Sequence, residues 1–313
     1  MNSNTNNSKA IILILLGMSV FALQDTFIKL ISDQINLYLI YFIRCTVGIT
    51  IMLIYLKLNK IPIIFKTYYP KLTLIRTILF FLGFSLYYFS LSKLSLALAV
   101  TLFFVSPFFV SIFSMIIIKE QVGIRRWSAI IVGFIGVYLV MDPDFNNFNI
   151  YSTFPVLCAI CYAFTVVIQK KTSDKDSVYS QILHIYLSAM IFSILIKIFQ
   201  TTIQFDPITI KTYSYLLMDW KINNISTLIL TLSIGFTGVI GFFSLFGAYR
   251  IGSPSTIAPY EYSLIIWSIL FGYFIWNDYL TINGFAGLSL ILIASFFTLY
   301  REYQLSIKVN FLI

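Results

Sequence analysis

The 313 residues are 59% hydrophobic and only 11% charged, and their mean hydropathy is +0.91. A soluble globular chain carries roughly 25% charged residues and needs a polar surface, so this composition excludes a soluble domain and predicts an integral membrane protein. The formal net charge of +9 does not indicate nucleic-acid binding, because the Lys and Arg residues lie between apolar runs and not together on one face.

Ten apolar runs approach the length of about 20 residues that a helix needs to cross about 30 Å of hydrocarbon. In chain order they are 10–31, 37–56, 72–91, 96–118, 127–141, 151–168, 179–199, 226–248, 256–275 and 281–300. The runs are continuous and do not alternate between polar and apolar residues, which argues against a membrane β-barrel. We therefore predict an all-α membrane protein with ten transmembrane helices.

The charges of the connecting segments predict the orientation of these helices. The N-terminus, the segments after the second, fourth, sixth and eighth runs, and the C-terminus contain fourteen Lys and Arg: Lys9, Lys57, Lys60, Lys66, Lys71, Lys119, Arg125, Arg126, Lys170, Lys171, Lys175, Arg250, Arg301 and Lys308. The other connecting segments contain three, Lys93, Lys211 and Lys221. Because positive residues favour the cytoplasmic side, we expect both termini in the cytoplasm.

Two stretches of the chain are similar to earlier stretches. Residues 17–29 align with 158–170, and further along Gly83-Phe84 aligns with Gly241-Phe242 and Glu120 with Asp278. This similarity predicts two repeats, 1–147 and 148–313, with five helices each. An odd number of helices inverts the second repeat in the membrane, and inverted repeats are typical of alternating-access transporters.

Several short motifs fall at corresponding places in the two repeats. The first repeat contains Ala97-Leu98-Ala99, Pro107, Lys119-Glu120, Trp127, Gly133 and Gly136, and the second contains Ala258-Pro259-Tyr260-Glu261-Tyr262, Trp267, Gly272, Trp276-Asn277-Asp278, Gly284 and Gly287. From about Leu16 to Glu302 the chain resembles the EamA-type members of the drug/metabolite transporter superfamily. That family usually has Gly-Glu in place of Asn277-Asp278, which is a conservative departure.

The resemblance implies a secondary carrier with a central cavity that opens alternately to each side, with the fifth and tenth helices at the periphery. Through the stretch around Tyr260 and Tyr262, the chain looks most similar to bacterial carriers of the S-adenosylmethionine-uptake and riboflavin-uptake kinds. It therefore implies a small organic metabolite and the lipid bilayer as partners, no cofactor, and a multi-pass protein of the bacterial inner membrane.

Ionisable residues inside the hydrocarbon usually mark a pathway or a paired structural contact. At 1.5 Å per residue, Asp25 and Arg44 both lie about 8–10 Å from the outer face, on helices joined by a short segment. This equal depth predicts an ion pair between them. A structural pair and a substrate-facing role are both open at this point.

A second group of polar residues is expected near the cytoplasmic face. Glu261, His184 and Arg76 each lie about 6–8 Å inside that face. Glu261 follows Pro259, which removes a backbone donor and loosens the helix, so we favour a functional role for this carboxylate. A single histidine such as His184 is more typical of a helix–helix hydrogen bond than of a proton relay. Arg76 is close enough to the membrane surface for its guanidinium to reach the aqueous interface.

Tyr260 and Trp267 are seven residues apart and share a helix face. That face either offers an aromatic surface to a ligand or packs against other helices, and the spacing is compatible with both.

Two other classes of membrane protein are alternatives to a carrier. One is a membrane enzyme, and the other is a channel or scaffold. An enzyme would need a catalytic or metal-binding constellation, but the chain has one His, no clustered acidic residues in the apolar runs and no P-loop. We therefore expect no catalytic residues and no metal site. Glu261, Asp25, Tyr260, Trp267, His184 and Arg44 are the candidate residues for substrate binding or coupling.

Overall fold

In a computed structural model of the chain, residues 7–119, 124–141, 149–203, 205–252, 257–279 and 281–310 are described, and this part of the chain contains helices and no strand. The α-helices are α1 (Asn7–Ile31), α2 (Leu37–Leu58), α3 (Pro70–Leu91), α4 (Leu96–Phe103), α5 (Ser106–Phe113), α6 (Ile124–Met141), α7 (Thr153–Thr172), α8 (Val178–Thr202), α9 (Pro207–Thr212), α10 (Ser214–Leu217), α11 (Ile225–Ile251), α13 (Ser263–Trp276) and α14 (Ile282–Asn310). The shorter elements are the π-helical η1 (Ser114–Ile118) and the 3₁₀-helical η2 (Ile150–Ser152) and η3 (Ala258–Tyr262). The all-α class predicted from the sequence is confirmed for the described residues.

Seven helical segments within the described ranges are long and apolar enough to cross a membrane. They are Lys9–Ile31, Leu37–Leu58, Pro70–Leu91, Leu96–Ile118, Ile150–Thr172, Val178–Thr202 and Ile225–Ile251. The other three predicted runs fall mainly on α6, on η3 with α13, and on α14. The protein is thus a multi-pass membrane protein.

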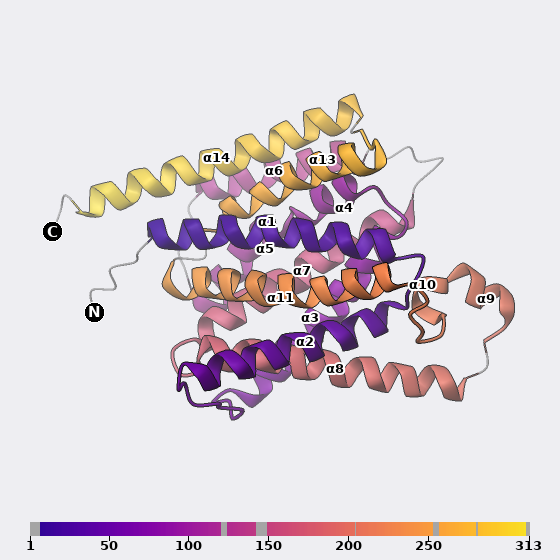
Figure 1. The fold of residues 1–313 in the computed structure, drawn as a ribbon. Coiled ribbons are helices and arrows are strands. Elements are labelled where there is room, and N and C mark those ends of the chain that lie inside the picture. The colour runs from indigo at the N-terminus through magenta and orange to yellow at the C-terminus, as the bar shows by residue number, and fades with distance from the viewer. Residues whose placement is uncertain are drawn as a thin grey trace.

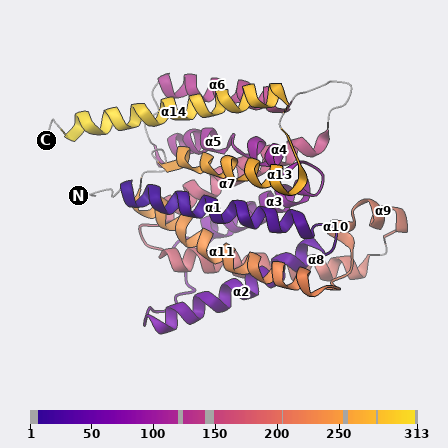
Figure 2. The ribbon, with the colours of Figure 1, turned by 45° about the horizontal axis from the view of Figure 1, so that its top comes forward.

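The long helices run roughly along one common direction (Figures 1 and 2). In Figure 1, α6, α13 and α14 lie on one side of the bundle, α2 and α8 lie on the other, and α1 and α11 lie between them. The helix pairs in contact include α1 with α11, α3 with α7, α2 with α8, α4 with α13 and α6 with α14. Helices that are far apart in the sequence are therefore interleaved in space.

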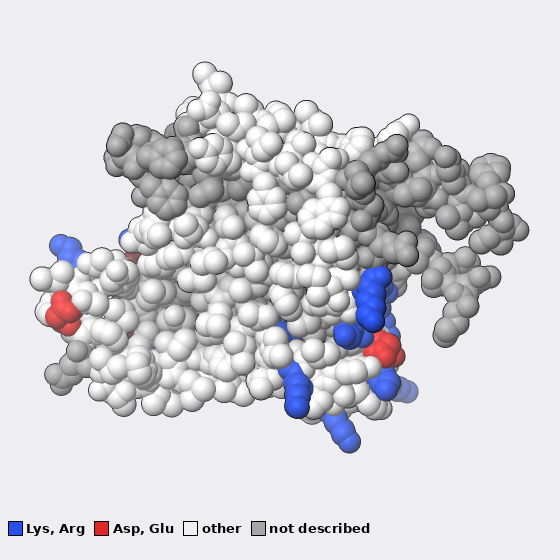
Figure 3. All heavy atoms as spheres, turned by 180° about the vertical axis from the view of Figure 1, so that it is seen from behind, with Lys and Arg blue, Asp and Glu red and all other residues white. Residues whose placement is uncertain are grey.

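The charged side chains are concentrated at the ends of this bundle. On the face seen in Figure 3, Lys and Arg gather mainly at one end, and the broad middle is free of charged side chains where its residues are described. A wide uncharged band between charged ends is the surface that a bilayer requires.

Two close helix crossings use small residues. A Cβ atom added at Gly17 of α1 would lie 3.5 Å from the carbonyl oxygen of Gly241 in α11, and one added at Gly83 of α3 would lie 2.7 Å from the Cβ atom of Cys161 in α7 and 3.5 Å from the Cα atom of Cys158. Gly17 aligns with Cys158 and Gly83 with Gly241 in the sequence comparison, so the two crossings occur at equivalent positions. Cys158 and Cys161 are free thiols, and both lie at this crossing, where small side chains allow close approach.

Prolines interrupt two of the predicted runs. The run 96–118 divides into α4 and α5, because Pro107 in the first turn of α5 has no N–H to donate and its ring conflicts with the carbonyl four residues earlier. The ninth run begins with η3, which has Pro259 in its first turn and places Glu261 on a 3₁₀ turn before α13. The loosening predicted from Pro259 is confirmed by this change of helix type.

Candidate functional site

Fifteen side chains from α1, α2, α3, α4, α7, α11, η3 and α13 line a central cavity with about 530 Å³ of empty space, its opening included. Elements of both predicted repeats contribute to the lining. Three lining residues have a charged group: the carboxylates of Asp25 and Glu261 and the guanidinium of Arg44. The part of this space that the centre of a water molecule can occupy is about 40 Å³, so the lining side chains lie close together. The cavity is the candidate functional site.

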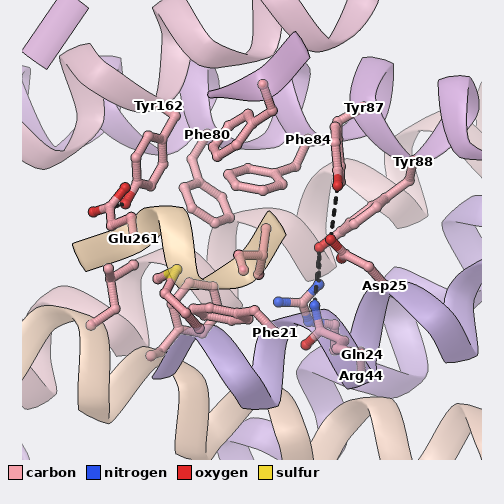
Figure 4. A pocket seen from close by; sticks show the side chains of 15 residues that line it. Phe21, Gln24, Asp25, Arg44, Phe80, Phe84, Tyr87, Tyr88, Tyr162 and Glu261 are labelled. Atoms are coloured by element: carbon pink, nitrogen blue, oxygen red, sulfur yellow. Dashed lines mark hydrogen bonds between the residues drawn. The ribbon is translucent and has the colours of Figure 1, made fainter. Parts of the chain in front are cut away.

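Glu261 forms one end of the cavity (Figure 4). Its side chain is 1% exposed, and its Oε1 atom accepts hydrogen bonds from the hydroxyl groups of Tyr162 at 2.9 Å and of Tyr249. Two donors from α7 and α11 therefore hold a carboxylate that the 3₁₀ turn of η3 directs into the bundle.

A polar cluster forms the other end. The hydroxyl of Tyr87 donates to Oδ2 of Asp25 at 2.8 Å, and Nη1 of Arg44 donates to the hydroxyl of Tyr88 at 2.8 Å. The Tyr88 hydroxyl also accepts from Nε2 of Gln24 at 3.2 Å. Asp25 and Arg44 are 5% and 3% exposed, so both are enclosed by the protein.

The predicted ion pair between Asp25 and Arg44 is absent. Both side chains are described, both line the cavity, and no salt bridge joins them. Each charged group instead has a tyrosine hydroxyl of α3 as its partner. The equal depth calculated from the sequence placed the two residues at one level, but depth alone does not fix the contact between them.

Aromatic rings line the cavity between its two polar ends. In Figure 4, Phe21, Phe80 and Phe84 lie between Glu261 and the Asp25 cluster. The ring centroids of Phe80 and Phe84 are 4.5 Å apart, and the guanidinium carbon of Arg44 lies 5.4 Å from the ring centroid of Phe242. The cavity thus offers an aromatic middle section with charged groups at either end.

Three candidate residues lie away from the cavity lining. Trp267 is 40% exposed and stacks on Phe271, with a ring-centroid distance of 6.1 Å, so it belongs to the outer surface of the bundle. Tyr260 is half-buried and packs against the core. Nε2 of His184 is 2.7 Å from the carbonyl oxygen of Phe65, which belongs to the segment between α2 and α3.

Arg76 does not extend to the surface as the sequence analysis allowed. Its side chain is fully buried, and Nη2 donates to the carbonyl oxygen of Gln181 in α8 at 3.2 Å. The helices that enclose it come from elsewhere in the sequence, so its depth along α3 did not reveal them.

The tyrosines that hold the charged groups were missed by the sequence analysis. The repeat alignment contained a signal for part of the lining. Phe21 aligns with Tyr162 and Phe84 with Phe242, and the same register places Phe103 over Glu261. All of these positions line the cavity, so both members of each aligned pair face it.

Within the described ranges, no group of three or more His, Cys, Asp or Glu side chains is arranged to hold a metal ion. The side chains that line the cavity offer a ligand charge, hydrogen bonds and aromatic contact.

The profile of the EamA-like transporter family matches residues 8–142 and again 150–300. The chain belongs to the EamA-like transporter family, within the drug/metabolite transporter superfamily. The resemblance noted from the sequence motifs is confirmed.

Several curated relatives cover most of the chain. An S-adenosylmethionine uptake transporter of Rickettsia prowazekii is 24% identical over 92% of this chain and 91% of its own length. A riboflavin transporter of Vibrio cholerae is 24% identical over 75% of this chain and 73% of its own, and a pseudopaline exporter of Pseudomonas aeruginosa is 22% identical over 88% and 91%. A solved crystal structure with 14% sequence identity has a TM-score of 0.66 and covers 94% of this chain and 96% of its own, which shows a shared fold.

Proposed function

We propose that the protein is a secondary-active carrier that moves a small organic metabolite across the membrane by alternating access. The observation that supports this most directly is the central cavity, in which two carboxylates and a guanidinium are buried inside an apolar helix bundle. Ionisable groups within a membrane are costly, and they mark substrate or ion pathways.

The proposed architecture has ten membrane spans in two inverted repeats, 1–147 and 148–313, with both termini in the cytoplasm of a bacterial cell and the protein in its inner membrane. The twofold match of the family profile supports two repeats. The helix contacts support them as well, because exchanging the repeats turns the pair α1 with α11 into the pair α7 with α3. Transporters of this kind bind substrate at the interface between the repeats.

The proposed substrate is a small organic metabolite with a positive charge or an aromatic ring. S-adenosylmethionine has both, a flavin has the ring, and an amino acid has the charge. The aromatic middle of the cavity and its polar ends support this class, and so do the relatives named for S-adenosylmethionine and riboflavin. We propose uptake as the direction, although one relative is named as an exporter.

Counterflow in proteoliposomes tests the proposal. A ligand is first chosen by thermal-shift screening of the purified protein with metabolites, because a ligand that binds the folded state stabilises it. Vesicles loaded with that unlabelled ligand should then accumulate the labelled ligand from outside in a saturable manner. Flux without saturation or counterflow would indicate a channel, and chemical conversion of the ligand would indicate an enzyme.

Glu261→Gln is the matching variant. The Tyr162 and Tyr249 hydroxyls can still donate to the amide oxygen, so the fold should persist, whereas loss of the charge should slow counterflow by about tenfold or more. Asp219→Asn removes an exposed carboxylate, paired with Lys221 at 3.8 Å, and should leave counterflow unchanged. A rate in Glu261→Gln equal to that of the unaltered protein would remove Glu261 from the site.

A further inference from the structure

Asp25 and Arg44 carry opposite charges, face the same cavity and do not neutralise each other directly. They are nevertheless held side by side. Their tyrosine partners, Tyr87 and Tyr88, are consecutive residues of α3 with ring centroids 5.6 Å apart, and Gln24, the neighbour of Asp25 in α1, binds the same hydroxyl as Arg44. The carboxylate of Asp25 and the guanidinium of Arg44 thus lie close together, but no salt bridge joins them.

Both groups have unused hydrogen-bonding capacity. A carboxylate offers about four acceptor positions and a guanidinium five N–H donors. The described contacts engage Oδ2 of Asp25 and Nη1 of Arg44, with one hydrogen bond at each. Oε1 of Gln24 is also buried and has no hydrogen-bond partner. Buried charged and polar groups are stabilised when a ligand supplies the missing partners.

We propose that this cluster binds the zwitterionic head group of an α-amino acid. Arg44 binds the carboxylate, Asp25 binds the ammonium group, and the amide of Gln24 lies beside both. The side chain of the amino acid extends along the phenylalanine rings toward Glu261, which binds a cationic or hydrogen-donating group at its far end. The inference rests on the proposed transport function and narrows its substrate class.

The spacing of the two charges in the substrate favours this assignment over simpler ions. An α-amino acid carries both charges on one carbon, so their binding groups must be neighbours, as Asp25 and Arg44 are. An amine alone would leave the buried guanidinium of Arg44 without an anionic partner, and an acid alone would face the carboxylate of Asp25. A flavin ring offers neither an ammonium group nor an α-carboxylate.

Binding of matched ligand series to the purified protein tests this. The first series is tryptophan, tryptamine and indole-3-propionate, which share one side chain and lack in turn the carboxylate and the amine; the second is S-adenosylmethionine and its decarboxylated form. In at least one series the amino acid should bind at least about tenfold more tightly than its truncated forms. An amine or acid that binds as tightly as its parent amino acid, or no binding in either series, overturns the proposal.

Two variants assign the roles. Arg44→Gln should make an amino acid and its amine bind within about threefold of each other, and Asp25→Asn should do the same for the amino acid and its acid. Arg250→Gln and Asp219→Asn, which alter exposed residues, should keep the selectivity of the unaltered protein. If Arg44→Gln retains the full preference for the amino acid, Arg44 does not bind the carboxylate.

The ligand series requires only the unaltered protein, so it decides the question even where a variant does not fold. It is also separate from the transport assay. Selective amino acid binding without counterflow would contradict the proposed carrier and support the head-group site, whereas counterflow of riboflavin with no amino acid binding would support the carrier and overturn the site.

Discussion

The two ends of the helix bundle contain aligned positions of the two predicted repeats, but their chemistry is opposite. We call one group the isoleucine layer: Ile28, Ile31, Ile35, Ile40 and Ile234. The aligned group is the polar layer: Gln169, Thr172, Asp176, Gln181 and Arg76. Every member of both layers is buried, so the difference is one of side-chain chemistry and not of exposure.

The layers lie at opposite ends of the bundle. The isoleucine layer surrounds the start of α2, where Asn36 donates from Nδ2 to the carbonyl oxygens of Leu216 and Met218 beside α10. The polar layer surrounds the start of α8. This helix is 25 residues long, and α9 follows its other end, so the polar layer lies at the end of α8 that is distant from α9. In the proposed orientation the isoleucine layer is nearer the outside and the polar layer is nearer the cytoplasm.

The polar layer is held by a partly satisfied hydrogen-bond network. Nε2 of Gln169 donates to Oε1 of Gln181 at 3.1 Å, and Nε2 of Gln181 donates to Oγ1 of Thr172 at 3.0 Å. Nε and Nη1 of Arg76 and Oε1 of Gln169 are buried without a hydrogen-bond partner. Asp176 accepts from Oγ1 of Thr67 and the backbone N–H of Tyr68.

Because the two layers differ in chemistry, we expect them to differ in the free energy needed to open them. Opening the isoleucine layer would expose apolar surface at about 25 cal/mol for each Å². Opening the polar layer would give water to Nε and Nη1 of Arg76, which have no hydrogen-bond partner while it is closed. We therefore expect the polar layer to open at the lower cost in free energy.

The largest expected effect comes from moving the polar chemistry into the isoleucine layer. Ile234→Arg places a guanidinium at the position aligned with Arg76, but among aliphatic neighbours, and an uncompensated buried charge costs about 3–5 kcal/mol. We expect little folded protein and a large fall in the unfolding temperature in detergent. Ile225→Arg, at the exposed start of α11, is the control and should unfold near the temperature of the unaltered protein. Normal stability of Ile234→Arg would show that this layer is already hydrated.

A smaller effect of opposite sign is expected from Arg76→Met. The change removes a buried charge with two unpartnered nitrogens and keeps a similar apolar volume, so the folded state should be equally stable or more stable by up to about 2 kcal/mol. Thermal unfolding of the purified variant, with Arg250→Met as the exposed control, measures this. Destabilisation by several kcal/mol would mean that the attraction between Arg76 and Asp176, the buried carboxylate of the same layer, outweighs the cost of burying the guanidinium.

The sequence predicted the charged residues of the cavity because an ionisable residue inside an apolar run is conspicuous. This signal identified Asp25, Arg44 and Glu261, and all three line the cavity. The tyrosines around them were not predicted, because the chain has 21 Tyr and 31 Phe and an aromatic residue in an apolar helix is ordinary.

The remaining differences between the predictions and the structure concern which surface a residue meets. Helical spacing showed that Tyr260 and Trp267 share a face, but the face that Trp267 presents is directed outward, and only the packing of α13 decides that. His184 binds a carbonyl of the segment between α2 and α3, whose path depends on contacts distant in sequence. Periodicity and depth therefore give the helices and their levels, while the partners require the assembled bundle.

The smallest expected effect is a difference in how often the two layers open. Thr172 and Ile31 are aligned, both are about 1% exposed, and each can be replaced by cysteine in a background where Cys45, Cys158 and Cys161 are alanine. When local opening is fast, the rate of labelling by a water-soluble thiol reagent follows the equilibrium population of the open state. Water favours the open form of the polar layer and disfavours that of the isoleucine layer.

Without ligand, the Thr172→Cys protein should therefore react about three to ten times faster than the Ile31→Cys protein, a difference of about 0.6–1.4 kcal/mol. Labelling of both denatured proteins controls for intrinsic thiol reactivity. Equal rates, or faster labelling of Ile31→Cys, would show that the polar layer closes as firmly as its aligned counterpart, and the chemical difference between the layers would then have no consequence for opening.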